Sequence, residues 1–149
     1  MRAVKCCLAI VASFALTAPA LAEPFCADLE ALANDEGTDT FSLPPPLAPY
    51  LATCSRSLAL SGAENLHCHW SFPYRDAEAT ETFTALLANV TLCLGPKATV
   101  STDDRVNHPD AYDLRLLRLG GQEFGVSLKD KGALQQTLIF LRVQLVPPH

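Results

Sequence analysis

Apolar and polar residues alternate along residues 66–75 and then change to a longer period. The apolar parity carries Leu66, Cys68, Trp70, Phe72 and Tyr74, and the polar parity carries His67, His69, Ser71, Pro73 and Arg75. This alternation predicts a strand with one apolar and one polar face. Apolar residues then recur at three- and four-residue spacing, which predicts a helix over 76–94. We expect the helix to pack on the apolar face of the strand, so that the strand's aromatic residues lie in the core rather than on a ligand-stacking surface.

Capping residues mark both ends of the predicted 76–94 helix. Asp76 is a favourable N-cap residue, and Glu78 and Glu81 lie near the positive end of the helix dipole. Gly95 followed by Pro96 is typical of a helix C-terminus. These caps make this the best-defined helix that the sequence predicts.

The C-terminal half of the chain returns to period two. Residues 112–116 and 124–128 alternate on either side of Gly120-Gly121, which predicts a hairpin with a tight turn. A second turn is expected at 129–132. Residues 134–145 carry apolar side chains on both parities, which predicts a strand that is covered on both faces or central in the sheet.

The N-terminal half contributes shorter elements. Residues 25–34 predict a short helix, and 42–49 read as a stiff proline-rich connector. Residues 50–60 predict a strand that pairs antiparallel with the alternating strand across a loop at 61–65, and 97–101 favour a further short strand. The elements together predict a single α+β domain, in which an antiparallel sheet carries one main helix and a short N-terminal helix.

The chain begins like an exported protein. Arg2 and Lys5 precede an apolar run of about 11 residues, which is short of the roughly 20 that a spanning helix needs. Small residues follow, and we expect a cleavable signal over 1–22 with cleavage after Ala22. The remaining 23–149 would form one exported domain in the periplasm or the extracellular space, with no membrane span.

The net charge of the chain disfavours some classes of binding partner. It holds 11 Lys and Arg against 16 Asp and Glu, a formal net charge of −5, and loss of the signal would take this to −7. An acidic protein of this kind is a poor partner for nucleic acid and for anionic membrane surfaces. A protein or small-molecule partner of unknown identity remains as the expectation.

Four cysteines follow the signal: Cys26, Cys54, Cys68 and Cys93. An even number in a small exported domain favours two disulfides, and the wide spacing disfavours a zinc site. Measured from the corner at residues 75–76, Cys68 lies about 23 Å back along the strand and Cys93 about 26 Å along the helix. These similar lengths predict a Cys68–Cys93 disulfide, which leaves Cys26 to pair with Cys54.

Two histidines are the first candidates for chemistry. His67 and His69 project from one strand face about 7 Å apart, close enough to bind one metal ion if His108, Asp110 or His149 supplied a third ligand. We favour the alternative, in which both are exposed histidines on a solvated face, and we expect no metal.

Arg75 continues the parity of these histidines at the junction of strand and helix. We interpret it as the ion-pair partner of a nearby carboxylate, with the anchoring of an acidic ligand as the alternative. If a surface of this protein binds a ligand, we expect it at His67, His69 and Arg75.

Other polar clusters carry weaker signals. The loop 103–113 is rich in carboxylates but lacks the spacing of a calcium loop. Nucleophile and phosphate-binding motifs are absent from the sequence, and the sequon at 89–91 falls inside the predicted helix. We therefore expect a non-catalytic binding or accessory protein without a cofactor. The alternative is a small metal-dependent or hydrolytic enzyme that uses His67 and His69 or the 103–113 loop.

Overall fold

The computed structural model describes residues 23–34, 47, 50, 52–58, 62–103 and 112–144. Its elements are α1 (Glu23–Ala33), β1 (Thr53–Leu58), β2 (Glu64–Pro73), α2 (Ala77–Leu94), β3 (Thr99–Thr102), β4 (Tyr112–Leu119), β5 (Gln122–Lys131), a short 3₁₀ turn (Gly132–Leu134) and β6 (Gln136–Gln144). The expected signal, and the expected proline-rich connector apart from Leu47, lie outside the described residues.

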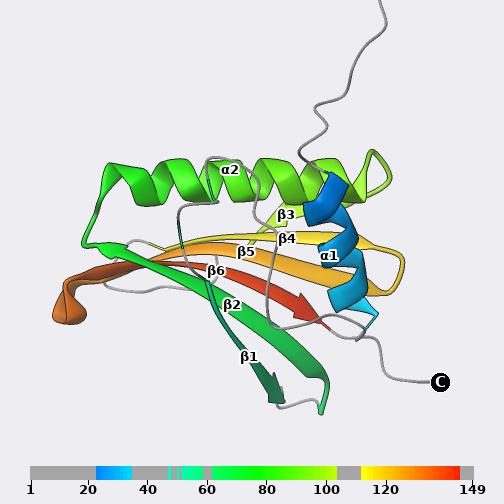
Figure 1. Ribbon diagram of the computed structural model, residues 1–149, viewed down its shortest axis with the longest axis horizontal. Helices are drawn as coiled ribbons and strands as arrows, with labels where there is room; N and C mark the ends of the chain where they lie inside the picture. The colour runs from blue at the N-terminus through cyan, green and yellow to red at the C-terminus, as the bar shows by residue number, and fades with distance from the viewer. Residues whose placement is uncertain are drawn as a thin grey trace, which may run out of the picture.

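The strands form one antiparallel sheet with the order β1-β2-β6-β5-β4-β3. Two hairpin connections, β1–β2 and β4–β5, were predicted from the alternating pattern, and both are confirmed. β6 lies between β2 and β5, as the apolar residues on both of its parities predicted. α2 follows β2 near one edge of the sheet and leads to β3 at the opposite edge, so the predicted α+β class is confirmed (Figure 1).

α2 begins and ends where its capping residues predicted. The Asp76 side chain accepts a hydrogen bond from the backbone N–H of Glu78 at 3.0 Å. Gly95 adopts φ 72° and donates its N–H to the carbonyl of Thr91, which closes the last turn. The helix buries a stripe made of Ala79, Thr82, Phe83, Leu86 and Val90.

α2 covers the expected face of the sheet, but it lies over other strands than we expected. We expected α2 to lie on the apolar face of β2, but its main contacts are with β5 and β6. In Figure 1, β2 meets α2 only at the corner after Pro73 and then slants away from the helix axis toward β1. A twisted sheet produces this divergence, because a helix aligned with the central strands cannot follow an outer one.

The apolar face of β2 is nevertheless in the core. Trp70 and Phe72 are buried as predicted, and they belong to one hydrophobic cluster with Phe25 of α1. The ring of Tyr50 packs on Phe72 at a centroid distance of 5.0 Å. Tyr74 lies beyond the end of β2 and stays half-exposed, with the Arg75 guanidinium over its ring.

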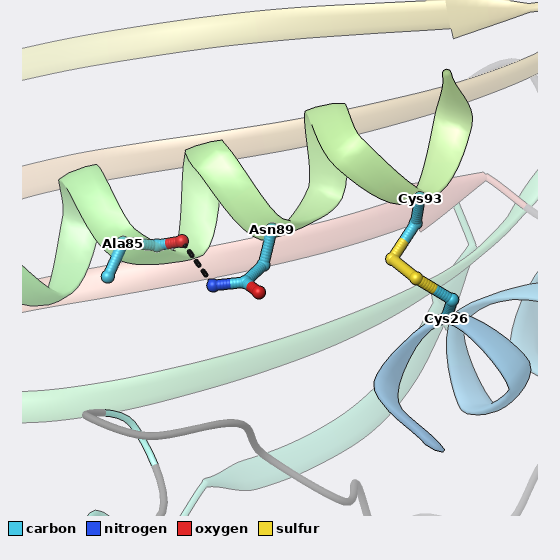
Figure 2. Close-up of a disulfide and its surroundings, with 4 residues drawn as sticks. All are labelled: Cys26, Ala85, Asn89 and Cys93. Carbon is cyan, nitrogen blue, oxygen red and sulfur yellow. Dashed lines mark hydrogen bonds between the residues drawn. A yellow bond between two sulfur atoms is a disulfide. The ribbon is translucent and has the colours of Figure 1, made fainter. Parts of the chain in front are cut away.

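The predicted disulfide pairing is wrong. The bridges are Cys26–Cys93, which joins α1 to the end of α2 (Figure 2), and Cys54–Cys68, which joins β1 to β2. Cys54 and Cys68 are direct register partners, with Cα atoms 4.0 Å apart. The hairpin turns between Leu58 and Glu64, earlier than we expected, and this register places the two cysteines opposite each other.

Two residues at equal distances from a corner lie close together only when the strand axis and the helix axis run side by side. β2 and α2 diverge (Figure 1), and Cys93 near the end of α2 is bonded to Cys26 of α1 rather than to Cys68. Two disulfides are typical of proteins in oxidising compartments. Within the described part of the chain, no helix is both long and apolar enough to cross a membrane.

Candidate functional site

The face of the sheet opposite α2 carries a pocket of about 220 Å³, here called the open-face pocket. Its floor is the middle of β5, where Gly125 and Ser127 are buried despite lying on the face away from the helix. Small residues in a central strand leave a hollow when the neighbouring strands carry larger side chains. The pocket therefore follows from the composition of three adjacent strands.

Strand register arranges the pocket in three rows across the sheet. The middle row places Ser127 between Leu114 of β4 and Phe140 of β6, so two apolar side chains flank a small polar one. At one end, Gly125 lies beside Arg142, whose partner on β2 is His67.

At the other end of the pocket, Tyr112 of β4 is the register partner of Lys129 of β5. The Lys129 ammonium lies over the Tyr112 ring at 5.7 Å from its centroid. A cation held over an aromatic face is stabilised by the ring quadrupole. The pocket thus has an apolar middle and a cationic group at each end.

The open face is basic although the chain is acidic. Among the described strand residues that share the parity of the pocket, the charged side chains are Arg118, Glu123, Lys129, Lys131 and Arg142. Glu123 forms ion pairs with both Arg118 and Arg142, and its Oε2 lies 2.7 Å from Arg118 Nη2. Lys129 forms no ion pair with a carboxylate among the described residues, although the negative charge of Asp103 acts on the neighbouring Tyr112.

Burial changes the proton affinity of three pocket residues. It lowers the pKa of His67 below its ordinary value of 6.5, and the nearby Arg142 lowers this pKa further. Burial raises the pKa of Tyr112, although the positive Arg142 opposes the change. Burial also lowers the pKa of Lys129, with a contribution from Lys131 on the same strand face. Both effects on His67 favour its neutral imidazole form.

The predicted binding residues do not all lie together. His67 lines the open-face pocket, and His69 lies two residues along the same strand face with its ring 5.8 Å from Phe140. Arg75 does not continue this face, because it adopts φ 57° in the turn after β2. Its Nε lies 3.3 Å from the buried carboxylate of Asp130, on the side of the sheet that α2 covers.

The Arg75 corner is a structural network. The backbone N–H of Arg75 donates to the Thr137 hydroxyl at 2.8 Å, and that hydroxyl donates to Asp130 at 2.6 Å. The interpretation of Arg75 as a carboxylate partner agrees with this geometry. Its role toward an external acidic ligand stays a prediction.

The 103–113 loop is described only at its two ends. Asp103 donates its N–H to the Leu114 carbonyl, Tyr112 enters the pocket, and Asp113 pairs with Arg115 at 2.8 Å. Residues 104–111 lie outside the described residues, as does His149, so the predicted third metal ligands are not placed. Within the described ranges, no group of three or more His, Cys, Asp or Glu side chains is arranged to hold a metal ion.

Sequence reasoning missed most of the pocket. Ser127, Lys129, Phe140 and Arg142 lie on strands that were predicted, but their shared location depends on the order of those strands. The available signal was Gly125, a glycine that interrupts an otherwise regular strand pattern.

A second pocket of about 260 Å³ lies between α1, the end of α2 and the start of β5, where it is lined by Cys26, Leu29, Cys93 and Phe124 among others. It adjoins the Cys26–Cys93 disulfide, and Glu30 and Gln122 contribute polar groups to its lining. No family model, curated protein sequence or solved structure matches the chain. The two pockets are therefore the features of this protein that bear on its function.

Proposed function

We propose that this chain is an exported, non-catalytic binding protein that holds its ligand on the open sheet face, in the open-face pocket. The observation that carries the proposal is the pocket itself, in which small residues form the floor while apolar and cationic side chains form the walls. Mostly apolar concave sites with a few directed polar groups are the usual form of a ligand site. The volume of about 220 Å³ is below the range of drug-sized sites, which favours a small ligand.

The polar groups of the pocket favour binding over catalysis. Ser127 shares a side-chain hydrogen bond with Tyr112, and Arg142 is paired with Glu123. A serine nucleophile needs a base such as histidine as its hydrogen-bond partner, and a phenol does not supply one at neutral pH. His67 lies at the Arg142 end of the pocket, and its register partner on β6 is this arginine rather than a nucleophile.

Export is part of the proposal. The N-terminal pattern of basic residues, a short apolar run and small residues is that of a cleavable signal, and two disulfides accord with an oxidising destination. Disulfides stabilise a small folded domain by constraining its unfolded chain, which suits a protein that acts outside the cytoplasm. N-terminal sequencing of the exported protein would begin at Glu23 if the signal is cleaved after Ala22.

The test maps where small probes bind. Isotope-labelled exported protein is titrated separately with phenol and isopropanol, and backbone amide shifts are followed by NMR. We expect the largest shifts in the middle of β5 and in the facing parts of β4 and β6. Shifts that cluster instead around the Cys26–Cys93 pocket would overturn the assignment of the site.

A matched pair of glycine variants sharpens this test. A Cβ at Gly125 would lie 3.5 Å from Arg142 Nε and 3.6 Å from Leu116 Cδ2, so Gly125→Ala fits but reduces the hollow. A Cβ at Gly121, in the turn, meets nothing within 4 Å. Gly125→Ala should weaken probe binding at the open face, whereas Gly121→Ala should leave it unchanged. Equal effects of the two variants would contradict the proposal.

The enzyme alternative has its own measurement. Elemental analysis of untagged protein is compared with that of the His67→Ala/His69→Ala double variant, with circular dichroism to confirm the fold. We expect no stoichiometric metal in either protein. A metal that is present in the native protein and lost in the folded double variant would replace the non-catalytic proposal with a metal-dependent one.

A further inference from the structure

One end of the open-face pocket carries a cation, Lys129, that forms no ion pair among the described residues. Lys129 is half-buried and held over the Tyr112 ring, and no carboxylate of the described residues pairs with it. Arg142, at the other end, already shares Glu123 with Arg118. The two ends of the pocket are therefore not equivalent, and Lys129 is the group with capacity for an external anion.

The middle of the pocket is suited to an apolar group. Leu114 and Phe140 flank Ser127 in one row of register partners, so a flat or narrow apolar body can lie over Ser127 between two apolar walls. A fully hydrated anion such as phosphate gains little from such walls. A molecule with one anionic end and a short apolar body matches both features.

We propose that the open-face pocket binds a small organic carboxylate, with the carboxylate at the Lys129 ammonium and an apolar body over Ser127 between Leu114 and Phe140. This inference rests on the proposed function and specifies the ligand class for the same site. The described strand residues of this face include four cations and one carboxylate, in an otherwise acidic protein, and this excess of positive charge adds a longer-range attraction for anions.

The contact to Lys129 determines the expected preference. A charge-assisted hydrogen bond between an ammonium and a carboxylate is about twice as strong as a neutral one. Benzoate and benzamide have nearly the same shape and differ in charge, so their affinities isolate this term. We expect benzoate to bind about tenfold more tightly than benzamide, with saturable shifts at the amides of Ser127 and Lys129.

Two lysine variants separate a specific contact from general charge. Lys129→Met and Lys131→Met remove the same charge from the same strand face, but only Lys129 lines the pocket. Lys129→Met should abolish the preference for benzoate over benzamide, and Lys131→Met should retain most of it. Thermal unfolding of both variants establishes that each is folded. Equal losses in the two variants would overturn the assignment of Lys129.

Further binding measurements distinguish a wrong ligand class from a wrong binding function. Inorganic phosphate should compete weakly with benzoate, and competition at equal concentration would overturn the requirement for an apolar body. If phenol and isopropanol bind at the open face but benzoate has no advantage over benzamide, the ligand class is wrong and the binding function stands. If none of these probes shifts the open-face amides, both proposals fail.

Discussion

Removal of the Cys26–Cys93 disulfide should destabilise the protein more than removal of Cys54–Cys68. The first bridge joins residues 67 apart in sequence and the second joins residues 14 apart. A cross-link reduces the entropy of the unfolded chain, and the reduction grows with the length of the loop that it closes. The two bridges therefore provide an internal comparison of long and short loop closure in one domain.

The loop lengths give the expected magnitudes. The chain-entropy relation yields about 4.4 kcal/mol for the longer loop and about 3 kcal/mol for the shorter one, a difference of roughly 1.4 kcal/mol. Replacing only one partner of each bridge keeps the comparison clean. Cys26→Ala and Cys54→Ala each remove a half-buried cysteine, and the buried Cys68 keeps its sulfur in the core.

The free energy of unfolding is measured by urea titration of the native protein and both variants under non-reducing conditions. Cleavage after glutamate places the four cysteines in four separate peptides, so non-reducing mass spectrometry can confirm the remaining bridge in each variant. We expect Cys26→Ala to have the lower stability. A larger loss in Cys54→Ala would refute loop closure as the dominant effect, and a native Cys68–Cys93 peptide would refute the pairing itself.

Two further perturbations have expected outcomes. Asp76→Ala should lower the free energy of unfolding by about 1 kcal/mol, because the Glu78 N–H loses its hydrogen-bond acceptor. Thr80→Ala, at an exposed position of the same helix, serves as the matched control. Equal losses of the two variants in urea titrations would contradict this prediction. Burial and Arg142 lower the folded-state pKa of His67, so the unfolded state binds a proton more readily and stability falls as the pH decreases through 6.5 toward that lowered pKa. His67→Gln should flatten the pH dependence of the unfolding midpoint in this window, and an unchanged slope would contradict the assignment.

Local patterns predicted the elements of this fold well. α2 was placed from its apolar period and from Asp76 and Gly95, whose capping hydrogen bonds the structure contains. The β4–β5 hairpin was placed from period-two alternation around Gly120-Gly121, and the turn glycine Gly120 adopts φ 60° as a tight turn requires. These features depend on residues within one or two turns of each other, so a single sequence is sufficient to identify them.

Global geometry was the source of the errors. The Cys68–Cys93 prediction assumed that α2 follows β2, but sheet twist and the order of the strands place α2 over β5 and β6. Arg75 was assigned to the face of His67 by extending the alternation past Pro73, where a positive φ ends it. Neither strand order nor the twist between strands is encoded in the spacing of residues along one segment.

The open-face pocket combines both kinds of information, and for that reason only part of it was predictable. The alternation of β2 placed His67 on a face away from the helix, and the same reasoning applied to β6 places Arg142 on one side of that strand. Only the pairing of β2 with β6, and of β6 with β5, brings His67, Arg142 and Gly125 into one row. The cationic and apolar groups of the pocket come from β4, β5 and β6, which follow one another along the chain, and His67 joins them only because β6 also pairs with the distant β2. A change in the order of these strands would therefore eliminate the pocket while leaving the hydrophobic pattern of each strand intact.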